Sequence, residues 1–413
     1  MSKKNSGFKF STTYWGLLVL AVICILFMFA EIINNRFWLS DFEVYYKSAY
    51  RILHSQNLYR IAADGHYVFK YSPTSAIYFI PFLIFPFAVA KYVYWIIITS
   101  LILSGFYLCI RIINPGLLKI ESGKPVTVII LFATLILALH FLRELHLGQV
   151  NYLMLYLYIL AMYFYMRQKR VIFSLILALS IFIKPFTLLF IPFLILKKRY
   201  AELLMFIGFC LALFLLPFLF YGTIDTTLAQ YQQWFNELQI ELSHKQGLLE
   251  NANHTLFSVF ARYSPIQFIL VNETIIIMYQ LAMLAGVGIL FLWFTKINSR
   301  NNSIEQQEYH FILEFSMLVA LIPLLAFTSE NAFIYTTIVV FIVLLFFKSL
   351  KLYEKGLAIV AFVFIGGNFG ELLGKSLSKK IDDISLISVG AIILIYLLFV
   401  LRVRGVLKIE KTE

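Results

Sequence analysis

The chain has 413 residues, of which 61% are hydrophobic and 14% are charged, and its formal net charge is +12. Soluble globular proteins contain roughly 45–50% apolar and about 25% charged residues, so this composition excludes a soluble fold. In a membrane protein, cationic cytoplasmic loops account for the positive charge, and we expect no nucleic-acid partner.

Apolar runs of membrane-spanning length recur along the chain, which predicts one all-α polytopic membrane domain over residues 1–413, surrounded by membrane lipids. The first run follows Lys3, Lys4 and Lys9, and we interpret it as a retained helix because no small-residue cleavage site follows it. About twelve transmembrane helices are predicted, near residues 14–33, 90–113, 126–142, 151–166, 171–184, 186–196, 203–220, 274–295, 311–327, 332–348, 356–373 and 385–402.

Residues 73–89 are also apolar, but Pro81 and Pro86 interrupt them and would kink a helix. If this segment crossed the membrane, the basic clusters in the middle of the chain would lie opposite the N-terminus. The positive-inside rule therefore favours a juxtamembrane or re-entrant segment, with both termini in the cytoplasm. This orientation predicts two long outer loops, 34–89 and 221–273, and we expect a multi-pass protein of a bacterial plasma (inner) membrane.

The first outer loop contains Ser40-Asp41-Phe42-Glu43, and Ser-x-x-Glu is the signature of a capping box that starts a helix. Apolar residues then follow at helical spacing as far as Leu53, which predicts an amphipathic helix on the membrane surface. Asp41 lies in its first turn. Its carboxylate is a candidate catalytic group, although complementing the helix dipole would explain it equally simply.

Further polar residues lie where membrane helices are predicted to end. His146, Gln149 and Asn151 surround Gly148 at an outer surface, and the dipeptide Lys184-Pro185 breaks an apolar run. An ionisable group at membrane depth suggests function, but Lys184 could also reach the interface with its long side chain. The second long loop adds four polar residues, Asn251, Asn253, His254 and Arg262.

Several motifs are missing from the sequence. It contains no phosphate-binding glycine loop, no metal-ligand cluster and no Asp-x-Asp. We therefore expect no cytoplasmic nucleotide-sugar site, no metal and no cofactor.

Taken in order, these residues resemble a known family. Ser40-Asp41-Phe42-x-x-Tyr45-Tyr46, Leu58-Tyr59, Phe69-x-Tyr71-x-Pro73, Gly148-Gln149-x-Asn151, Lys184-Pro185, Asn253 and Arg262 are similar to the motifs of glycosyltransferase family 87 over roughly residues 38–265. This family comprises polyprenol-phosphate-mannose-dependent mannosyltransferases of the GT-C fold. The resemblance implies a polyprenyl-phosphate sugar donor, a lipid-linked or glycan acceptor, and inverting transfer on the outer membrane face.

The resemblance also implies roles for individual residues. The catalytic aspartate of the family corresponds to Asp41, which would act as the base for the acceptor hydroxyl. Its Gly-Gln-x-Asn turn corresponds to Gly148, Gln149 and Asn151. Independently of the resemblance, the leaving phosphate needs a cation, which Lys184 or Arg262 could supply, with Arg143 and His146 as further candidates. The remaining candidate substrate-binding residues are Tyr45, Tyr71 and Asn253.

The chain departs from the family pattern late in the sequence, where Ser329-Glu330-Asn331-Ala332 replaces a Ser-Trp-x-His-type motif. Ser55 and Ser72 also stand where glycine and proline are frequent in the family. Two other functions are alternatives to that of a hexosyltransferase that prefers mannose. A transporter or lipid flippase would explain Lys184 in a broken helix, but no paired halves with matching interrupted helices are found. A non-catalytic scaffold would leave the outer polar residues unexplained.

Overall fold

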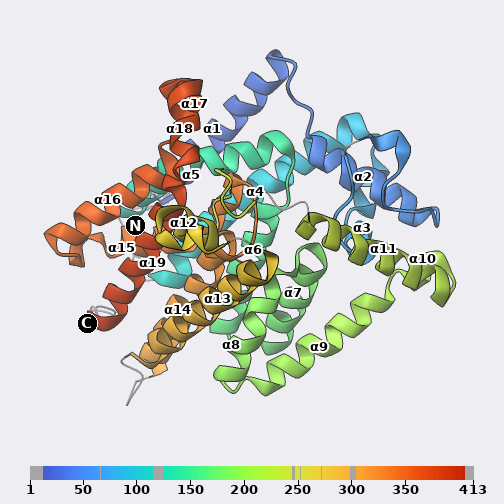
Figure 1. Cartoon of the computed structure of the whole chain (residues 1–413). Helices are drawn as coiled ribbons and strands as arrows, with labels where there is room; N and C mark the ends of the chain where they lie inside the picture. The colour runs from blue at the N-terminus through green and yellow to red at the C-terminus, as the bar shows by residue number, and fades with distance from the viewer. Residues whose placement is uncertain are drawn as a thin grey trace, which may run out of the picture.

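The computed structural model describes residues 13–65, 67–114, 124–243, 247–251, 253–270, 272–297 and 304–404, and within these ranges all regular secondary structure is helical. The α-helices are α1 (Thr13–Ile33), α2 (Ser40–Leu53), α3 (Pro73–Ile77), α4 (Phe87–Ile113), α5 (Lys124–Leu147), α6 (Asn151–Met166), α7 (Arg170–Ile183), α8 (Phe190–Leu196), α9 (Tyr200–Leu215), α10 (Phe218–Tyr221), α11 (Ile224–Ser243), α12 (Leu256–Tyr263), α13 (Glu273–Lys296), α14 (Ile304–Leu325), α15 (Thr337–Leu345), α16 (Leu352–Gly366), α17 (Gly370–Leu373), α18 (Lys375–Asp383) and α19 (Leu386–Arg404). They form one helical bundle (Figure 1). Three of the short 3-10 helices bear on the site, namely η2 (Ile80–Ile84), η4 (Pro185–Leu189) and η6 (Glu330–Thr336).

Seven helical stretches in the described ranges are long and apolar enough to cross a membrane, and they contain α1, α4, α5, α9, α13, α14 and α19. The chain is therefore an all-helical integral membrane protein. The predicted number of twelve spans is not confirmed, because the apolar helices at 151–166, 170–183, 185–196 and 330–345 are only 10–17 residues long. At 1.5 Å per residue such helices are shorter than a hydrocarbon core of about 30 Å. The expected span 356–373 also ends early, since α16 stops at Gly366.

One end of the bundle is fastened by buried ion pairs. Glu314 of α14 lies 2.9 Å from Arg402 of α19 and 2.5 Å from Lys197, which follows α8. Arg402 also donates hydrogen bonds to the carbonyl oxygens of Thr295 and Ile297 where α13 ends.

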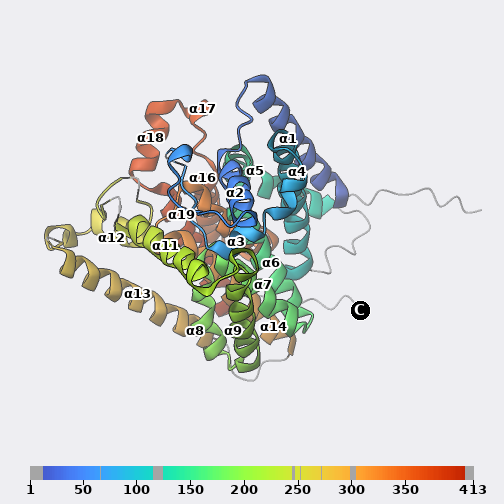
Figure 2. The ribbon, with the colours of Figure 1, turned by 90° about the vertical axis from the view of Figure 1, so that its right-hand side faces the viewer.

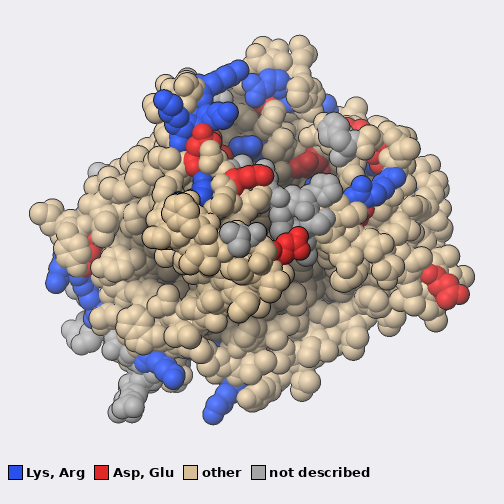
Figure 3. Space-filling view, in the orientation of Figure 1, with Lys and Arg blue, Asp and Glu red and all other residues tan. Residues whose placement is uncertain are grey.

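The charged side chains on the surface lie mainly at the two ends of the bundle. On the face drawn in Figure 3, a few basic side chains lie along the lower edge, and a charged rim surrounds a hollow at the top. A wide area with few charges separates the two.

Residues 73–89, which the sequence predicts not to cross the membrane, lie at the end of the bundle opposite the buried ion pairs. They do not form one spanning helix, because α3 ends at Ile77, η2 follows, and α4 begins after Pro86. The Ser72 hydroxyl donates to the carbonyl of Phe182, 2.7 Å away, at the end of α7. The hydroxyl of Thr74 donates to the carbonyl of Leu213 near the end of α9, at 3.0 Å. The segment thus packs across helix ends.

Helix α13 is the least covered of the long apolar helices. Only 6% of its apolar stretch is buried inside the protein, and Figure 2 shows it slanting away from the bundle towards α12. Because so little of it packs against other helices, spaces remain along its sides, and one of them adjoins the candidate site.

Candidate active site

Asp41 is placed by the first turn of α2. The helix begins at Ser40, as predicted, but the expected capping box is wrong: the N-cap is Leu39, which has a φ of 49° and makes no side-chain capping bond. Glu43 instead forms an ion pair with Lys47, with the two charged atoms 2.8 Å apart. The start of α2 is therefore held by its packing.

That packing is against Gly148 in the turn between α5 and α6. Gly148 has a φ of +71°, a region that favours glycine. A Cβ atom on it would lie 2.9 Å from the Cβ of Phe42 and 3.1 Å from the Cβ of Leu39. The ring of Phe42 also stacks on Tyr94, with the centroids 4.1 Å apart. The glycine thus lets α2 approach closely enough for Asp41 to meet Gln149.

For the glycosyl transfer expected from the sequence, Gly148→Ala should lower turnover at least tenfold, because the added methyl group pushes α2 away from the turn and displaces Asp41, and small misplacements of reacting groups are costly. Gly222→Ala is the matched control, since Gly222 has a φ of +74° but open space where its Cβ would lie. It should lower the unfolding temperature without lowering turnover. Equal loss of turnover in both variants would show that backbone strain alone is responsible.

The Gly-Gln-x-Asn turn and the Lys-Pro break meet in one polar network. Lys184 ends α7, and its Nζ donates to Asn151 Oδ1 at 2.6 Å. Asn151 Nδ2 in turn donates to Gln149 Oε1 at 2.8 Å. The structure therefore brings together three of the residues that the sequence proposes for substrate binding, and the Gln149 side chain lies close enough to the Asp41 carboxyl group to act on its pKa as a hydrogen-bond donor.

Two members of this network were missed in the sequence. Glu144 of α5 accepts hydrogen bonds from Asn151 Nδ2 at 2.7 Å and from Asn331 Nδ2 at 3.1 Å. Asn331 of η6 also donates to Gln149 Oε1. Both side chains are buried. An acidic residue near the end of an apolar helix is the signal that could have identified Glu144, whereas Asn331 was noted only as part of a departure from the family motif.

Tyrosine side chains form one wall of the site. The hydroxyl groups of Tyr45 and Tyr71 are 3.2 Å apart, and Tyr59 donates to the carbonyl oxygen of Tyr71 at 2.7 Å. Lys184 Nζ lies 5.9 Å from the centre of the Tyr71 ring. Both proposed tyrosines therefore lie beside the Asp41–Lys184 pair.

Burial and the surrounding polar groups act in opposite directions on the pKa of the Asp41 carboxyl group. Burial raises its pKa above the usual value, while the hydrogen bond from Gln149 and the positive charges of Lys184 and Lys70 lower it. Burial is the largest of these effects, so the net pKa is raised. Asp41 is thus a carboxylate that binds a proton more readily than a solvated one.

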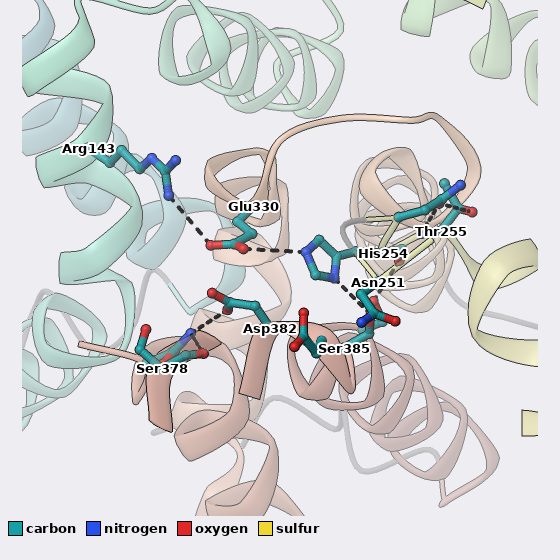
Figure 4. A network of polar contacts seen from close by, with 12 residues as sticks. Arg143, Asn251, His254, Thr255, Glu330, Ser378, Asp382 and Ser385 are labelled. Carbon is teal, nitrogen blue, oxygen red and sulfur yellow. Dashed lines mark hydrogen bonds and ion pairs between the residues drawn. The ribbon is translucent and has the colours of Figure 1, made fainter. Parts of the chain in front are cut away.

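Arg262 and Asn253 belong to a second network, shown in part in Figure 4. Arg262 donates to the carbonyls of Asp383 at 2.7 Å and Asn253 at 3.1 Å, tying α12 and the segment before it to the end of α18. Next to them, Glu330 lies 3.5 Å from Arg143 and 3.4 Å from His254. The two networks meet in η6, where Glu330 and Asn331 are neighbours in the chain.

His146 does not join either set of contacts. Its Nδ1 atom hydrogen-bonds to Glu31 at the end of α1, and its ring lies 6.4 Å from that of Trp38. Glu31 also lies 3.6 Å from Arg36. This histidine therefore fastens α5 to α1. In the part of the chain that the structure describes, no three His, Cys, Asp or Glu side chains are grouped in a way that could hold a metal ion.

A cavity of about 620 Å³ opens beside Lys184, between η4, α8, α13 and α14. Its lining consists of apolar side chains and Gly288, and it includes Pro185 and Phe186, which directly follow the lysine in the chain. Lys184 Nζ is 5.7 Å from the centre of the Phe186 ring. An apolar space thus leads away from a positive charge, which suits an amphiphile with an anionic head.

Comparison with known proteins gives one family match. The model of glycosyltransferase family 87 matches residues 69–327, which is more than half of the chain. The matched range includes Gln149, Asn151 and Lys184, while Asp41 lies before it. No curated protein matches the chain.

Proposed function

We propose that this chain, which belongs to glycosyltransferase family 87, moves a hexose, preferably mannose, from a polyprenyl-phosphate donor to a lipid-linked or glycan acceptor. The observation that carries the proposal is the position of Asp41 and Lys184. The Asp41 carboxylate and the Lys184 ammonium group lie at two ends of the same amide network, which runs through Gln149 and Asn151. Glycosyl transfer from a sugar phosphate needs this pair, a base for the acceptor and a cation for the leaving group.

The proposed reaction is a single displacement at the anomeric carbon. The acceptor hydroxyl attacks this carbon, its proton passes to the Asp41 carboxylate, and the bond to the phosphate oxygen breaks on the opposite side. The configuration at the anomeric carbon is therefore inverted, and polyprenyl phosphate leaves with the electron pair of the broken bond. Lys184 stabilises the charge that grows on the phosphate oxygen.

The apolar cavity beside Lys184 supports a lipid-linked donor. A phosphate bound at Lys184 would place its polyprenyl chain at Pro185 and Phe186, which line the cavity. An isoprenoid chain that packs against this apolar lining gains van der Waals contacts along its length. A nucleotide sugar has no apolar chain with which to use this space.

We propose that the site faces the outside of the cell and that both termini are cytoplasmic. The opposite end of the bundle carries Lys197, Arg199, Lys351 and Arg404. Basic residues in short loops are retained in the cytoplasm. In a bacterium this arrangement corresponds to the plasma membrane, with the donor carried to the outer face by its lipid.

The direct test is a transfer assay with purified protein in lipid nanodiscs. We expect release of polyprenyl phosphate from a polyprenyl-phosphate hexose, fastest with mannose, when a membrane extract supplies acceptors, and a hexose added to the product in its mass spectrum. Nucleotide sugars should not be consumed. Turnover of a nucleotide sugar by the purified protein would contradict the proposed donor.

Two glycine variants sharpen this test. Gly288 and Gly286 lie on opposite sides of α13, the first in the cavity beside Lys184 and the second in another apolar space, and a Cβ on either meets no atom within 4 Å. We expect Gly288→Leu to raise KM several-fold for long-chain donors and much less for short-chain analogues, because the leucine side chain takes the space in which the isoprenoid chain would pack and removes its van der Waals contacts. Gly286→Leu should leave KM for the donor unchanged. Equal effects of both variants on KM would show that the polyprenyl chain of the donor binds elsewhere.

A further inference from the structure

Glu144 is a fully buried carboxylate in the network beneath Asp41 and Lys184. Its Oε1 atom accepts hydrogen bonds from the amide nitrogens of Asn151 and Asn331. Its Oε2 atom accepts from the backbone N–H of Tyr152, at 3.1 Å. A carboxylate can only accept hydrogen bonds, so each group that faces it must present an N–H.

This requirement fixes the orientation of two side-chain amides. Asn151 and Asn331 must both turn Nδ2 towards Glu144, and both nitrogens also donate to Gln149 Oε1. Two nitrogens therefore alternate with two oxygens in a ring, and all four N–H groups of the two asparagine side chains are used. With Nδ2 so directed, the Oδ1 atom of Asn151 faces outward, where it accepts the hydrogen bond from Lys184.

The ring also fixes Gln149. Since its Oε1 atom receives both asparagine nitrogens, its Nε2 atom points the other way, which suits donation to the Asp41 carboxylate. The orientation imposed by Glu144 is thus transmitted along two branches. One branch ends in an N–H at Asp41, and the other ends in a carbonyl oxygen at Lys184.

We propose that Glu144 is a positioning residue that sets the direction of every amide in this network, so that Gln149 donates to Asp41 and Asn151 accepts from Lys184. The proposal rests on the assigned site but does not require knowledge of the substrate. It follows from hydrogen bonds between the side chains and from the fact that a carboxylate lacks donors.

The substitution Glu144→Gln tests whether Glu144 sets the orientation of the side-chain amides in this ring. The backbone N–H of Tyr152 cannot turn, so it retains an acceptor only if the new amide oxygen faces it. The new amide nitrogen then faces Asn151 and Asn331, and their oxygens must turn towards it. Gln149 reverses in the same way and presents its oxygen to Asp41, so the Asp41 carboxylate loses a hydrogen bond.

The titratable groups that face Asp41 are Lys184, Lys70, Tyr45 and Tyr94, and the substitution leaves all four in place. Losing a charged hydrogen bond, which is worth about 1 pH unit or more, makes Asp41 bind a proton at higher pH. Removing the negative charge of Glu144 would by itself lower the pKa of Asp41. The sign of the change therefore distinguishes a reversed amide from a lost charge.

The experiment is an infrared titration of the whole protein in nanodiscs, in which subtraction of Asp41→Asn spectra isolates the Asp41 carboxyl band. In Glu144→Gln we expect the midpoint of Asp41 to rise by up to about 1 unit, because the lost hydrogen bond outweighs the lost charge of Glu144. In a Gln149→Ala background, Glu144→Gln should cause no further rise, because the connecting amide is absent. An unchanged or lower midpoint in the single variant would overturn the proposal.

Glu31→Gln is the matched control, because Glu31 is also a buried carboxylate at the same end of the bundle but pairs with His146. Its substitution should leave the midpoint of Asp41 unchanged. If Glu144→Gln does not fold, Asn331→Ala removes one arm of the ring and should give a smaller rise. No change in that variant would then count against the proposal. Because the titration needs no substrate, a failure of the transfer assay leaves this test intact.

Discussion

Replacement of Asp41 by asparagine is expected to lower turnover by about 10²–10⁴, which is the usual contribution of general-base catalysis. The amide keeps the shape of the side chain but cannot take the proton of the acceptor hydroxyl. Donor affinity should remain close to that of the wild type, because in our proposal Lys184 and not Asp41 binds the donor phosphate. Single-turnover rates and donor titrations on the same preparation separate the two quantities.

Glu43→Gln is the control for this substitution. Glu43 lies on the same turn of α2 but pairs with Lys47, so its loss should change turnover less than about twofold, as expected for a surface ion pair. Wild-type turnover by Asp41→Asn would remove Asp41 from the mechanism and leave its carboxylate as a complement to the helix dipole.

The dependence of turnover on pH follows from the same residue. Burial raises the pKa of Asp41, and only the deprotonated form can act as a base. Turnover should therefore fall as the pH is lowered through this raised pKa, at a higher pH than for a solvated aspartate. A profile of turnover against pH measures this, and the acidic fall should be absent from the residual activity of Asp41→Asn.

Loss of the charge at Lys184 is expected to impair donor binding and turnover together. Lys184→Ala removes the cation that would face the phosphate, and a charged hydrogen bond of this kind is worth about 10- to 100-fold in affinity. Turnover should fall further, because more negative charge gathers on the phosphate oxygen as the bond breaks. Calorimetric titration with a polyprenyl-phosphate hexose measures the first effect, and single-turnover kinetics measure the second.

Arg262→Ala provides the contrast. Arg262 is engaged with backbone carbonyls of Asp383 and Asn253, so its loss should loosen α12 and the segment before it and lower the unfolding temperature, while donor affinity changes little. If instead Arg262→Ala weakens donor binding and Lys184→Ala does not, the phosphate site lies in the second network, beside His254 and Glu330.

The site was only partly predictable. The motifs that contain Asp41, Gln149, Asn151 and Lys184 predicted a common site, and the structure joins these four side chains. Arg262 and His146 were grouped with them because all are polar residues near predicted helix ends. Their partners, Asp383 and Glu31, come from distant parts of the chain, and no spacing in the sequence identifies such pairs.

What the sequence determined by itself was the class of protein and the breaks in its helices. The length of an apolar run and a proline that lacks an N–H act locally, so the seven long apolar helices and the interruptions at Pro86 and Pro185 could be located in advance, whereas the shorter apolar runs are not confirmed as spans. Residues 73–89 were for the same reason predicted to be broken, and the structure ends α3 at Ile77 before α4 begins.

Only the tertiary structure decided which polar groups meet. Asn331 lies 182 positions from Gln149 in the sequence and still shares a hydrogen bond with it. Glu144 acquires its role because three donors converge on it inside the bundle. The physical reason is that a buried carboxylate must be satisfied by whatever donors helix packing brings to it. That packing depends on the fit of whole helix faces, which a local pattern of residues does not specify.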